Sequence, residues 1–395
     1  MGSKVSLRIG GVFLLIVGSI AFTPIINGPP PNFGEPLAGL SADQLARFDA
    51  GKDDFEEVES VEEGLGPVFN GVSCGSCHST AAIGGAGTTL ETRFGTIGAD
   101  GKFDPLSQFG GSLIQTNGIG TAGTCSYQAE LVPGEATITA QRRTTALFGL
   151  GLVDAVPDKT FWDLAAAEAC DPDGIGGTVS VVTNLTTSLP AVGKFGWKNQ
   201  NPTLFQFSGD AYVNEMGITS PQFPGENCPQ GDCDSLSCNP MPTVNDDGSG
   251  VQKFADFMTF LAPPPRGKIT YAVNQGEDVF QRIGCVSCHV ATLRTGSNPV
   301  AALNRVRFHP YSDFLLHDMG SLGDGITQNL ATGKLMRTAP LWGVRMLTTL
   351  LHDGRSTTLD QAILAHDGQA KKARDRYNSL PSWKKTNLIA FLNSL

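Results

Sequence analysis

The sequence contains little charge, and the charge that it has is mostly negative. Charged side chains make up 17% of the 395 residues, and 38 acidic against 28 basic residues give a formal net charge of −10. Because nucleic acids are bound by basic surfaces, this balance argues against a nucleic-acid-binding protein. The 48 glycines and 24 prolines favour short helices joined by long, turn-rich loops. The length is sufficient for two fused domains.

Long apolar runs are equally scarce, and the one at the N-terminus is short. Residues 9–22 read IGGVFLLIVGSIAF after Lys4 and Arg8, a run of 14 residues, whereas a membrane-spanning helix needs about 20. Ser19 and Ala21 place small residues at positions −3 and −1 of a possible cleavage site, so residues 1–29 are predicted to be a signal peptide. An uncleaved N-terminal anchor is the alternative. Both predict a periplasmic protein that contacts the membrane at most through this segment.

Histidine is scarce too, and two of the six histidines directly follow paired cysteines. In a C-x-x-C-H motif the cysteines lie on one face of a helical turn, each can bond a haem vinyl group, and the histidine can ligate the iron. A zinc ribbon would need its second cysteine pair about 15–20 residues further on, but the two motifs are more than two hundred positions apart. We therefore predict two covalently bound c-type haems. The motifs comprise Cys74, Cys77 and His78, then Cys285, Cys288 and His289.

The surroundings of the two motifs repeat. GKDDF (51–55) and GEDVF (276–280) precede them, and apolar segments at 254–265 and 381–395 follow them. A helix, a haem loop and a closing helix form a cytochrome c unit, so we expect a mostly α fold with two such units. The predicted domains are 30–265, which carries the reactive haem and a long insertion, and 266–395, which carries an electron-transfer haem.

Five further cysteines remain, an odd number. In an oxidising compartment some of them should pair as disulfides and leave one thiol over. The close spacing of Cys228, Cys233 and Cys238 favours one local bridge, although the connectivity does not follow from the sequence. The other two are Cys125 and Cys170.

Several segments from residue 30 onward resemble one known family. They include EEGLGPVFNGVSCGSCH (62–78), RRTTALFGLGLVDAVP (142–157), VGKFGWKNQ (192–200), NEMGIT (214–219), LLHDMG (315–320) and RTAPLWGVRMLTTLLHDGRSTTLDQAILAHDG (337–368). They are similar to the di-haem oxidoreductase and peroxidase family, which is related to the bacterial di-haem cytochrome c peroxidases and to the di-haem enzyme that matures methylamine dehydrogenase. The resemblance implies an enzyme that reduces H₂O₂ at the first haem with electrons relayed by the second. The electrons would come from a small redox protein or another donor.

The resemblance also assigns roles to individual residues. No histidine lies between His78 and His289, so the insertion offers no second histidine to the first haem. Glu215 matches the acid of the peroxidases' distal pocket, where a carboxyl group can move the peroxide proton; ligation of the iron by Met216 is the alternative. His366 stands where the peroxidases carry a methionine ligand, so it should close the second haem and lower its potential.

Three further assignments rest on the resemblance. Trp197 matches a tryptophan that lies between the two haems, although a core tryptophan is an alternative. Thr338 and Pro340 match carbonyls that hold a Ca²⁺ in the relatives, and Gln206 falls near a distal-pocket glutamine. Two other functions stay open from the sequence: an electron-transfer cytochrome without its own substrate, and a haem oxygenase.

Overall fold

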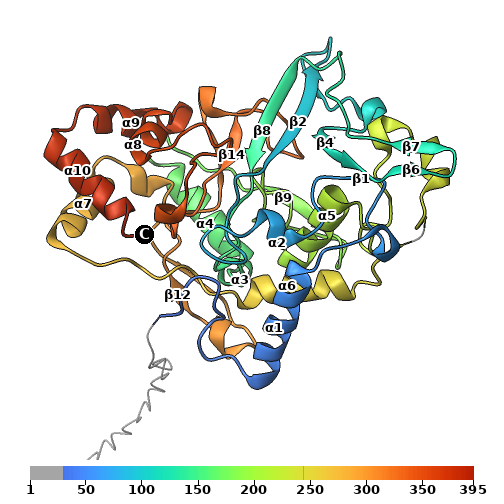
Figure 1. The fold of residues 1–395 in the computed structure, drawn as a ribbon. Helices are drawn as coiled ribbons and strands as arrows, with labels where there is room; N and C mark the ends of the chain where they lie inside the picture. The colour runs from blue at the N-terminus through green and yellow to red at the C-terminus, as the bar shows by residue number, and fades with distance from the viewer. Residues whose placement is uncertain (1–29, 243) are drawn as a thin grey trace, which may run out of the picture.

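The computed structural model describes residues 30–242 and 244–395, so the predicted signal peptide lies outside the described residues. Helices make up 35% and strands 16% of the structure, a mixed fold (Figure 1). The expectation of a mostly α protein was therefore wrong. Its error lies in the insertion, where segments rich in β-branched residues such as Leu90–Ile97 and Ile138–Arg143 pair as strands. Among the described residues, no helix is both long and apolar enough to cross a bilayer.

The helices are short, and several begin at a threonine. Thr203, Thr270 and Thr358 each accept a hydrogen bond from a backbone N–H of the first turn, which caps α5, α7 and α8. The α-helices of the described part are α1 Ala42–Glu56, α2 Cys74–Cys77, α3 Leu150–Asp154, α4 Asp158–Glu168, α5 Leu204–Met216, α6 Ser249–Phe260, α7 Tyr271–Arg282, α8 Leu359–Leu364, α9 Lys371–Asn378 and α10 Ser382–Leu392.

The strands form small antiparallel sheets. The largest is built on β2, which pairs with β3, β4 and β8 (Figure 1). Two-residue strands make up much of the rest. The strands are β1 Val68–Phe69, β2 Leu90–Ile97, β3 Phe103–Asp104, β4 Leu113–Ile114, β5 Asn117–Gly118, β6 Gly120–Ala122, β7 Cys125–Tyr127, β8 Ile138–Arg143, β9 Val181–Asn184, β10 Leu189–Val192, β11 Leu293–Arg294, β12 Arg307–Phe308, β13 Leu316–Asp318 and β14 Leu335–Arg337.

Two helix pairs, α1 with α6 and α7 with α10, repeat one packing arrangement. At each crossing a glycine lets the backbones approach: a Cβ on Gly51 would lie 2.3 Å from the Lys253 carbonyl oxygen, and a Cβ on Gly276 would lie 2.0 Å from that of Asn387. Four residues later, one helical turn on, Phe55 and Phe280 are buried. The repeated glycine–phenylalanine spacing thus joins each entry helix to its closing helix.

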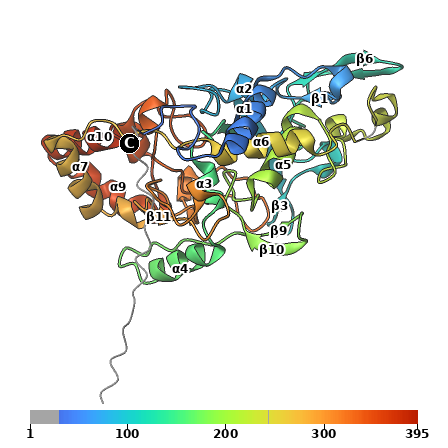
Figure 2. The same cartoon turned by 90° about the horizontal axis from the view of Figure 1, so that it is seen from below.

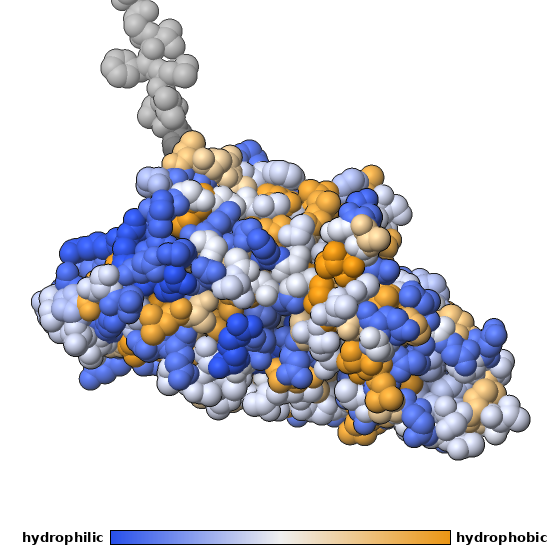
Figure 3. All heavy atoms as spheres, turned by 90° about the horizontal axis from the view of Figure 1, so that it is seen from above, coloured by the Kyte–Doolittle hydropathy of each residue, from blue (hydrophilic) through white to orange (hydrophobic). Residues whose placement is uncertain are grey.

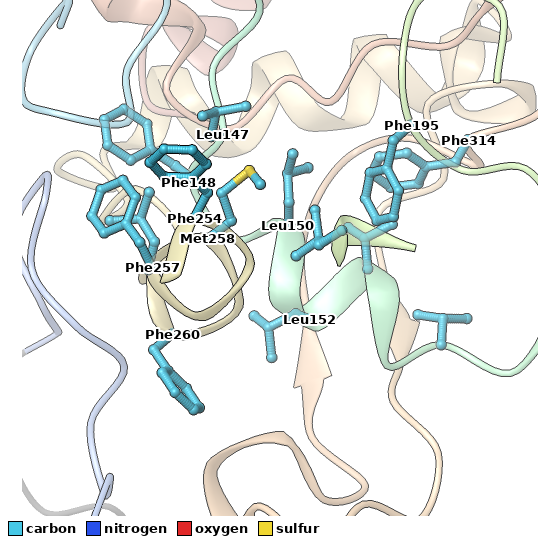
Figure 4. Close-up of a cluster of buried hydrophobic side chains, with 14 of the residues drawn as sticks. Leu147, Phe148, Leu150, Leu152, Phe195, Phe254, Phe257, Met258, Phe260 and Phe314 are labelled. Atoms are coloured by element: carbon cyan, nitrogen blue, oxygen red, sulfur yellow. The ribbon is translucent and has the colours of Figure 1, made fainter. Parts of the chain in front are cut away.

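Buried side chains gather in two main clusters. In the larger, Phe254, Phe257 and Met258 of α6 pack near Leu150 and Leu152 of α3 (Figure 4). The smaller lies among α7, α9 and α10, which gather at one end of the molecule in Figure 2. Residues 293–342 also contribute side chains to the larger cluster. The division at residues 265 and 266 stays a prediction.

Two disulfides crosslink the region that contains β7 and residues 228–238. Cys125 pairs with Cys238, and Cys228 pairs with Cys233. Cys170 is left as a free, exposed thiol. The expectation of some disulfides with one thiol left over is confirmed, and the local bridge lies between Cys228 and Cys233.

Candidate functional site

Each C-x-x-C-H motif borders its own cavity. The first cavity, of about 200 Å³, is lined by Cys74, Cys77 and His78. The second, of about 220 Å³, is lined by Cys285, Cys288 and His289. Phe55 of α1 and Phe280 of α7, from the helices that precede the two motifs, also line the first and the second cavity respectively. The structure therefore offers two separate sites of similar size.

Local structure brings each cysteine pair together. Cys74–Cys77 is a single helical turn whose N-terminus is capped by the Ser73 hydroxyl, which accepts a hydrogen bond of 3.1 Å from the Ser76 backbone N–H. At the second motif, a 3₁₀ turn over Cys285–Ser287 brings the two cysteines together. The phenylalanines of the entry helices then contact the following histidines, with ring centroids 5.9 Å apart for Phe55 and His78 and 6.2 Å for Phe280 and His289.

Three histidines of the cavities have the same hydrogen-bonding pattern. Their Nδ1 atoms lie 3.1, 2.9 and 2.7 Å from the backbone carbonyl oxygens of Gly85, Tyr311 and Ala362 respectively. Because a carbonyl only accepts, each Nδ1 carries the proton and each Nε2 keeps a free lone pair, as an iron ligand requires. The three are His78, His289 and His366.

Burial keeps these rings neutral. It lowers the pKa of His78 and of His289 to about 4, and it also lowers the pKa of His366. His366 follows α8 directly and lines the second cavity together with His289. Among the residues that the structure describes, His78 is the one histidine that lines the first cavity. The two cavities therefore differ in the number of histidines that they offer.

Glu215 lies at the end of α5 and lines the first cavity. Its Oε2 accepts a hydrogen bond of 3.0 Å from the Asn70 side chain, and its carbonyl oxygen accepts from the backbone N–H groups of Asn70 and Gly71. Burial and the neighbouring Glu91 carboxylate raise the pKa of Glu215 to about 8. Asn70 and Gly71, which precede the first cysteine pair, thus position the Glu215 carboxyl group, which can accept or release a proton near neutral pH.

The sequence analysis missed the partners of this carboxyl group. Glu91 and Arg93 stand two apart on β2, share one face and both line the first cavity. Arg93 donates two hydrogen bonds to Glu91, of 3.0 and 3.2 Å. Although burial opposes it, this guanidinium lowers the pKa of Glu91. The alternating charges of LETRF were the one available signal, but nothing in the sequence connects β2 with α5.

A glutamine lines the first cavity, but it is not Gln206. The Gln206 side chain accepts from the backbone N–H of Leu185 and donates to the carbonyl of Thr183, so it ties α5 to β9. Gln200 lines the first cavity instead. Met216 also lines that cavity and belongs to the larger hydrophobic cluster.

Trp197 and Arg143 line both cavities. The Trp197 indole N–H donates a hydrogen bond of 2.9 Å to the Arg143 carbonyl, and its ring meets the His352 ring edge-on at 6.1 Å. The Arg337 guanidinium lies 6.0 Å from the centre of the same ring. The tryptophan predicted to lie between the haems is thus a wall shared by the two sites.

A buried polar cluster supports the second motif. His317, on β13, contacts Asp313 at 3.0 Å through Nε2 and Gln369 at 2.8 Å through Nδ1, and its Nδ1 lies 3.7 Å from the Cys288 sulfur. Cys288, Asp313 and His317 are close enough to hold a metal ion. Both ring nitrogens are already engaged, however, and Cys288 belongs to the haem motif. We therefore interpret the cluster as a hydrogen-bonded support of the second loop.

The structure does not present Thr338 and Pro340 as a Ca²⁺ site. Both line the second cavity. The Thr338 carbonyl accepts a hydrogen bond of 2.7 Å from the Ser312 hydroxyl, and the buried Arg337 guanidinium lies 3.4 Å from the same oxygen. Ca²⁺ requires six to eight oxygen ligands, usually with carboxylates among them. The contacts of Thr338 do not supply such a ligand set, and the Ca²⁺ assignment stays a prediction.

Comparison with known proteins identifies the family. Residues 123–395 match the family described as "di-haem oxidoreductase, putative peroxidase". The chain belongs to this family. It is accordingly a di-haem oxidoreductase, an enzyme that uses haem. The matched region contains Trp197, Glu215, His366 and the second C-x-x-C-H motif, and the first motif precedes it. No curated protein matches the chain.

Several solved structures are similar in outline. A hydrazine synthase from Kuenenia stuttgartiensis shares 14% identity over 99% of this chain and 100% of that chain, with a TM-score of 0.44. A MauG-like protein associated with microbial copper homeostasis shares 15% identity over 93% of each chain, with a TM-score of 0.39. The di-haem peroxidase BthA from Burkholderia thailandensis shares 14% identity over 89% of this chain and 86% of that chain, with a TM-score of 0.40. At these values the assignment depends on the family match alone.

The residues of both cavities fit the haems of this family. Each cavity combines a paired-cysteine turn, an imidazole with a free Nε2 and a largely apolar wall. Burial raises the pKa of Cys74 and of Cys285 to about 12, so both groups are neutral thiols in the protein without its cofactors. The linings of the two cavities also differ: His366 lines the second, and Glu91, Arg93 and Glu215 line the first.

Proposed function

We propose that this di-haem oxidoreductase is an exported peroxidase that reduces H₂O₂ at the first site with electrons relayed through the second. Both haems would be attached through the cysteine pairs, with His78 and His289 as proximal ligands. The balanced reaction is H₂O₂ + 2 e⁻ + 2 H⁺ → 2 H₂O. When bound, the first haem would supply the iron that binds peroxide and passes it electrons.

One observation carries the proposal: among the described residues, the lining of the first cavity includes the half-buried carboxyl group of Glu215 and a single histidine, His78. Glu215 lines that cavity with a pKa of about 8. A carboxylate there can take the proton from one peroxide oxygen and return it to the other, which leaves as water. Arg93, which lines the same cavity, places positive charge where the leaving oxygen gains electron density.

The polar contacts of Glu215 hold it ready for this proton transfer. Asn70 donates to one carboxylate oxygen at 3.0 Å and thereby fixes the orientation of the group. The carboxylate of Glu91 favours one shared proton on the pair, because two adjacent carboxylates resist ionising together. Burial limits the access of bulk water, which would compete for the proton.

The second site is suited to electron storage and relay. His289 and His366 both present a free Nε2 and line one cavity, so two histidines would close this haem to substrate. Trp197 borders both cavities and provides an aromatic ring between them. Electrons would then pass from the second site through the Trp197 region to the first.

Export and the domain division are part of the same proposal. The signal pattern at residues 1–29 favours export, and the two disulfides favour an oxidising compartment. Residues 30–265 would carry the reactive haem and residues 266–395 the electron-transfer haem.

Peroxide consumption by the fully reduced holo-protein tests the proposal. Stopped-flow mixing with H₂O₂ should oxidise the protein by two electrons per peroxide while the peroxide disappears. A protein that does not consume peroxide, yet exchanges electrons with mediators, would be an electron carrier. A reduced protein that reacts with O₂ and not with peroxide would favour the haem oxygenase.

A further inference from the structure

We propose that the outer surface of α9 and α10 is the docking site of a small acidic redox protein, which delivers electrons to the second haem site. This inference rests on the proposed function and adds the chemistry of the electron donor. We define the basic face by five side chains of these helices: Lys371, Lys372, Arg376, Lys384 and Lys385.

The basic face has the opposite charge to most of the molecule. Residues 371–385 read KKARDRYNSLPSWKK, with six basic and one acidic residue, in a chain of net charge −10. Figure 3 shows a strongly hydrophilic surface at the end of the molecule where α9 lies. Because the chain as a whole is acidic, a concentration of basic side chains on one face would also orient the approach of an acidic partner.

Acidic groups neutralise part of the face. Asp375 pairs with Lys371 at 2.7 Å, and Asp173 pairs with both Lys372 and Arg376. Asp367 and Asp375 face the less exposed Arg374. The six cations of the segment still outnumber these three carboxylates.

Two lysines of the face have no carboxylate partner within the described part of the chain. The Nζ atoms of Lys384 and Lys385 lie 5.4 and 5.0 Å from the centres of the Trp383 and Tyr377 rings. Trp383 is itself 59% exposed, an unusual position for so large an aromatic side chain. Tryptophan is one of the residue types enriched in binding hot spots, and the two lysines beside it add positive charge.

The face lies directly over the second haem site. Ala373 and Arg374 of α9 line the second cavity, as do Leu388 and Leu392 of α10. The same two helices therefore form the basic face on their outer side and the cavity wall on their inner side. Because a helix is about 10 Å across, a partner that docks here comes within one helix diameter of the site. The electron would leave the partner's metal centre, which is oxidised, and reduce the iron of the second haem.

The test compares two double charge reversals in the holo-protein. Lys372→Glu/Lys385→Glu changes the basic face, and Lys102→Glu/Lys159→Glu applies the same change of charge to exposed lysines of the β2–β3 hairpin and of α4. The probes are a reduced acidic blue-copper protein and a reduced basic cytochrome c. Binding is measured by calorimetry, and reduction of the second haem is followed by stopped-flow absorbance at low and at high salt.

We expect the acidic probe to bind the wild-type and control proteins and to reduce the second haem faster at low salt. The basic-face variant should lose at least about tenfold in affinity and in rate, the order of an electrostatic steering effect. Equal behaviour of the two variants, or preference for the basic probe, overturns the docking site. Self-association of the wild-type protein, or its binding to anionic vesicles, would also overturn the docking site if only the basic-face variant lost that behaviour. Peroxide consumption by the wild-type protein with a small chemical reductant is measured in parallel. If the wild-type protein consumes no peroxide, the proposed function is refuted, and not the docking site.

Discussion

Replacing Glu215 by Gln removes the proton carrier of the first cavity while nearly preserving its shape and its hydrogen bond from Asn70. General acid–base assistance by one side chain is typically worth about 10²–10⁴-fold. Peroxide consumption should therefore fall by roughly that factor, whereas the absorption spectra of both haems should change little. The rate is measured by stopped-flow mixing of the reduced holo-protein with H₂O₂.

The rate of peroxide consumption should also depend on pH. The pKa of Glu215 is raised to about 8, so its carboxylate is present above pH 8 and is lost as the pH falls. At pH 7 only about one-tenth of the molecules carry the ionised base, so the wild-type rate should rise about tenfold per pH unit below pH 7, about fivefold from pH 7 to pH 8, and then level off. The Glu215→Gln variant should lack this slope.

Glu226 provides a matched control. Burial raises its pKa to about 7, yet it does not line either cavity. Glu226→Gln should keep both the rate and the slope. If Glu215→Gln consumes peroxide as fast as the wild type, or keeps the rise up to pH 8, the assignment of Glu215 as the proton carrier is wrong, even if the protein is a peroxidase.

Three further predictions concern the haems and the fold. The intact mass of the mature protein should exceed the polypeptide mass by two haems, and Cys74→Ser/Cys77→Ser should retain only one; two haems on this variant would contradict the attachment site. His366→Ala should convert the low-spin signal of the second haem to high spin in electron paramagnetic resonance, while a change of the first signal would reverse the assignment. Gly276→Ala should lower the free energy of unfolding by about 1–3 kcal/mol, because its Cβ would meet the Asn387 carbonyl at 2.0 Å; Gly134→Ala, with nothing within 4 Å, is the control, and equal denaturation midpoints would contradict the packing argument.

The local patterns of the sequence were the most informative. The C-x-x-C-H motifs marked both cavities, and the glycine–phenylalanine repeat marked the helix crossings at Gly51 and Gly276. In each case the pattern that carries the prediction lies within a few consecutive residues. Glu215 and His366 were found only because their segments resemble a family, since neither stands in a pattern that identifies it by spacing alone.

The sequence was less informative where distant segments meet. The Glu91–Arg93 pair reaches Glu215 only after β2 and α5 pack, and the Cys125–Cys238 bridge joins residues 113 positions apart. The mixed fold was missed for a related reason. A strand such as β2 gains its stability from pairing with β8, some fifty positions later, and a local reading of the chain shows neither partner.

Buried ion pairs are a further feature that the sequence does not reveal. Asp324 contacts Arg142 at 2.7 Å and Lys198 at 2.9 Å, and the three side chains are almost fully buried. Charges so buried must be paired to be tolerated. Here they join β8 to the segment after Trp197 and to a loop near β14, close to the wall between the cavities. The sequence places these residues far apart and presents each of them as an ordinary surface charge.

Electron paramagnetic resonance of the ferric holo-protein tests the central claim most directly, because it reports whether each iron has an open position. The account predicts one high-spin haem at the first site, where Glu215 lines the cavity without a second histidine, and one low-spin haem with two histidines at the second. The two signals should have equal intensity per chain. Two low-spin signals would contradict the account, since a closed first haem, ligated for example by Met216, could carry electrons but could not bind peroxide.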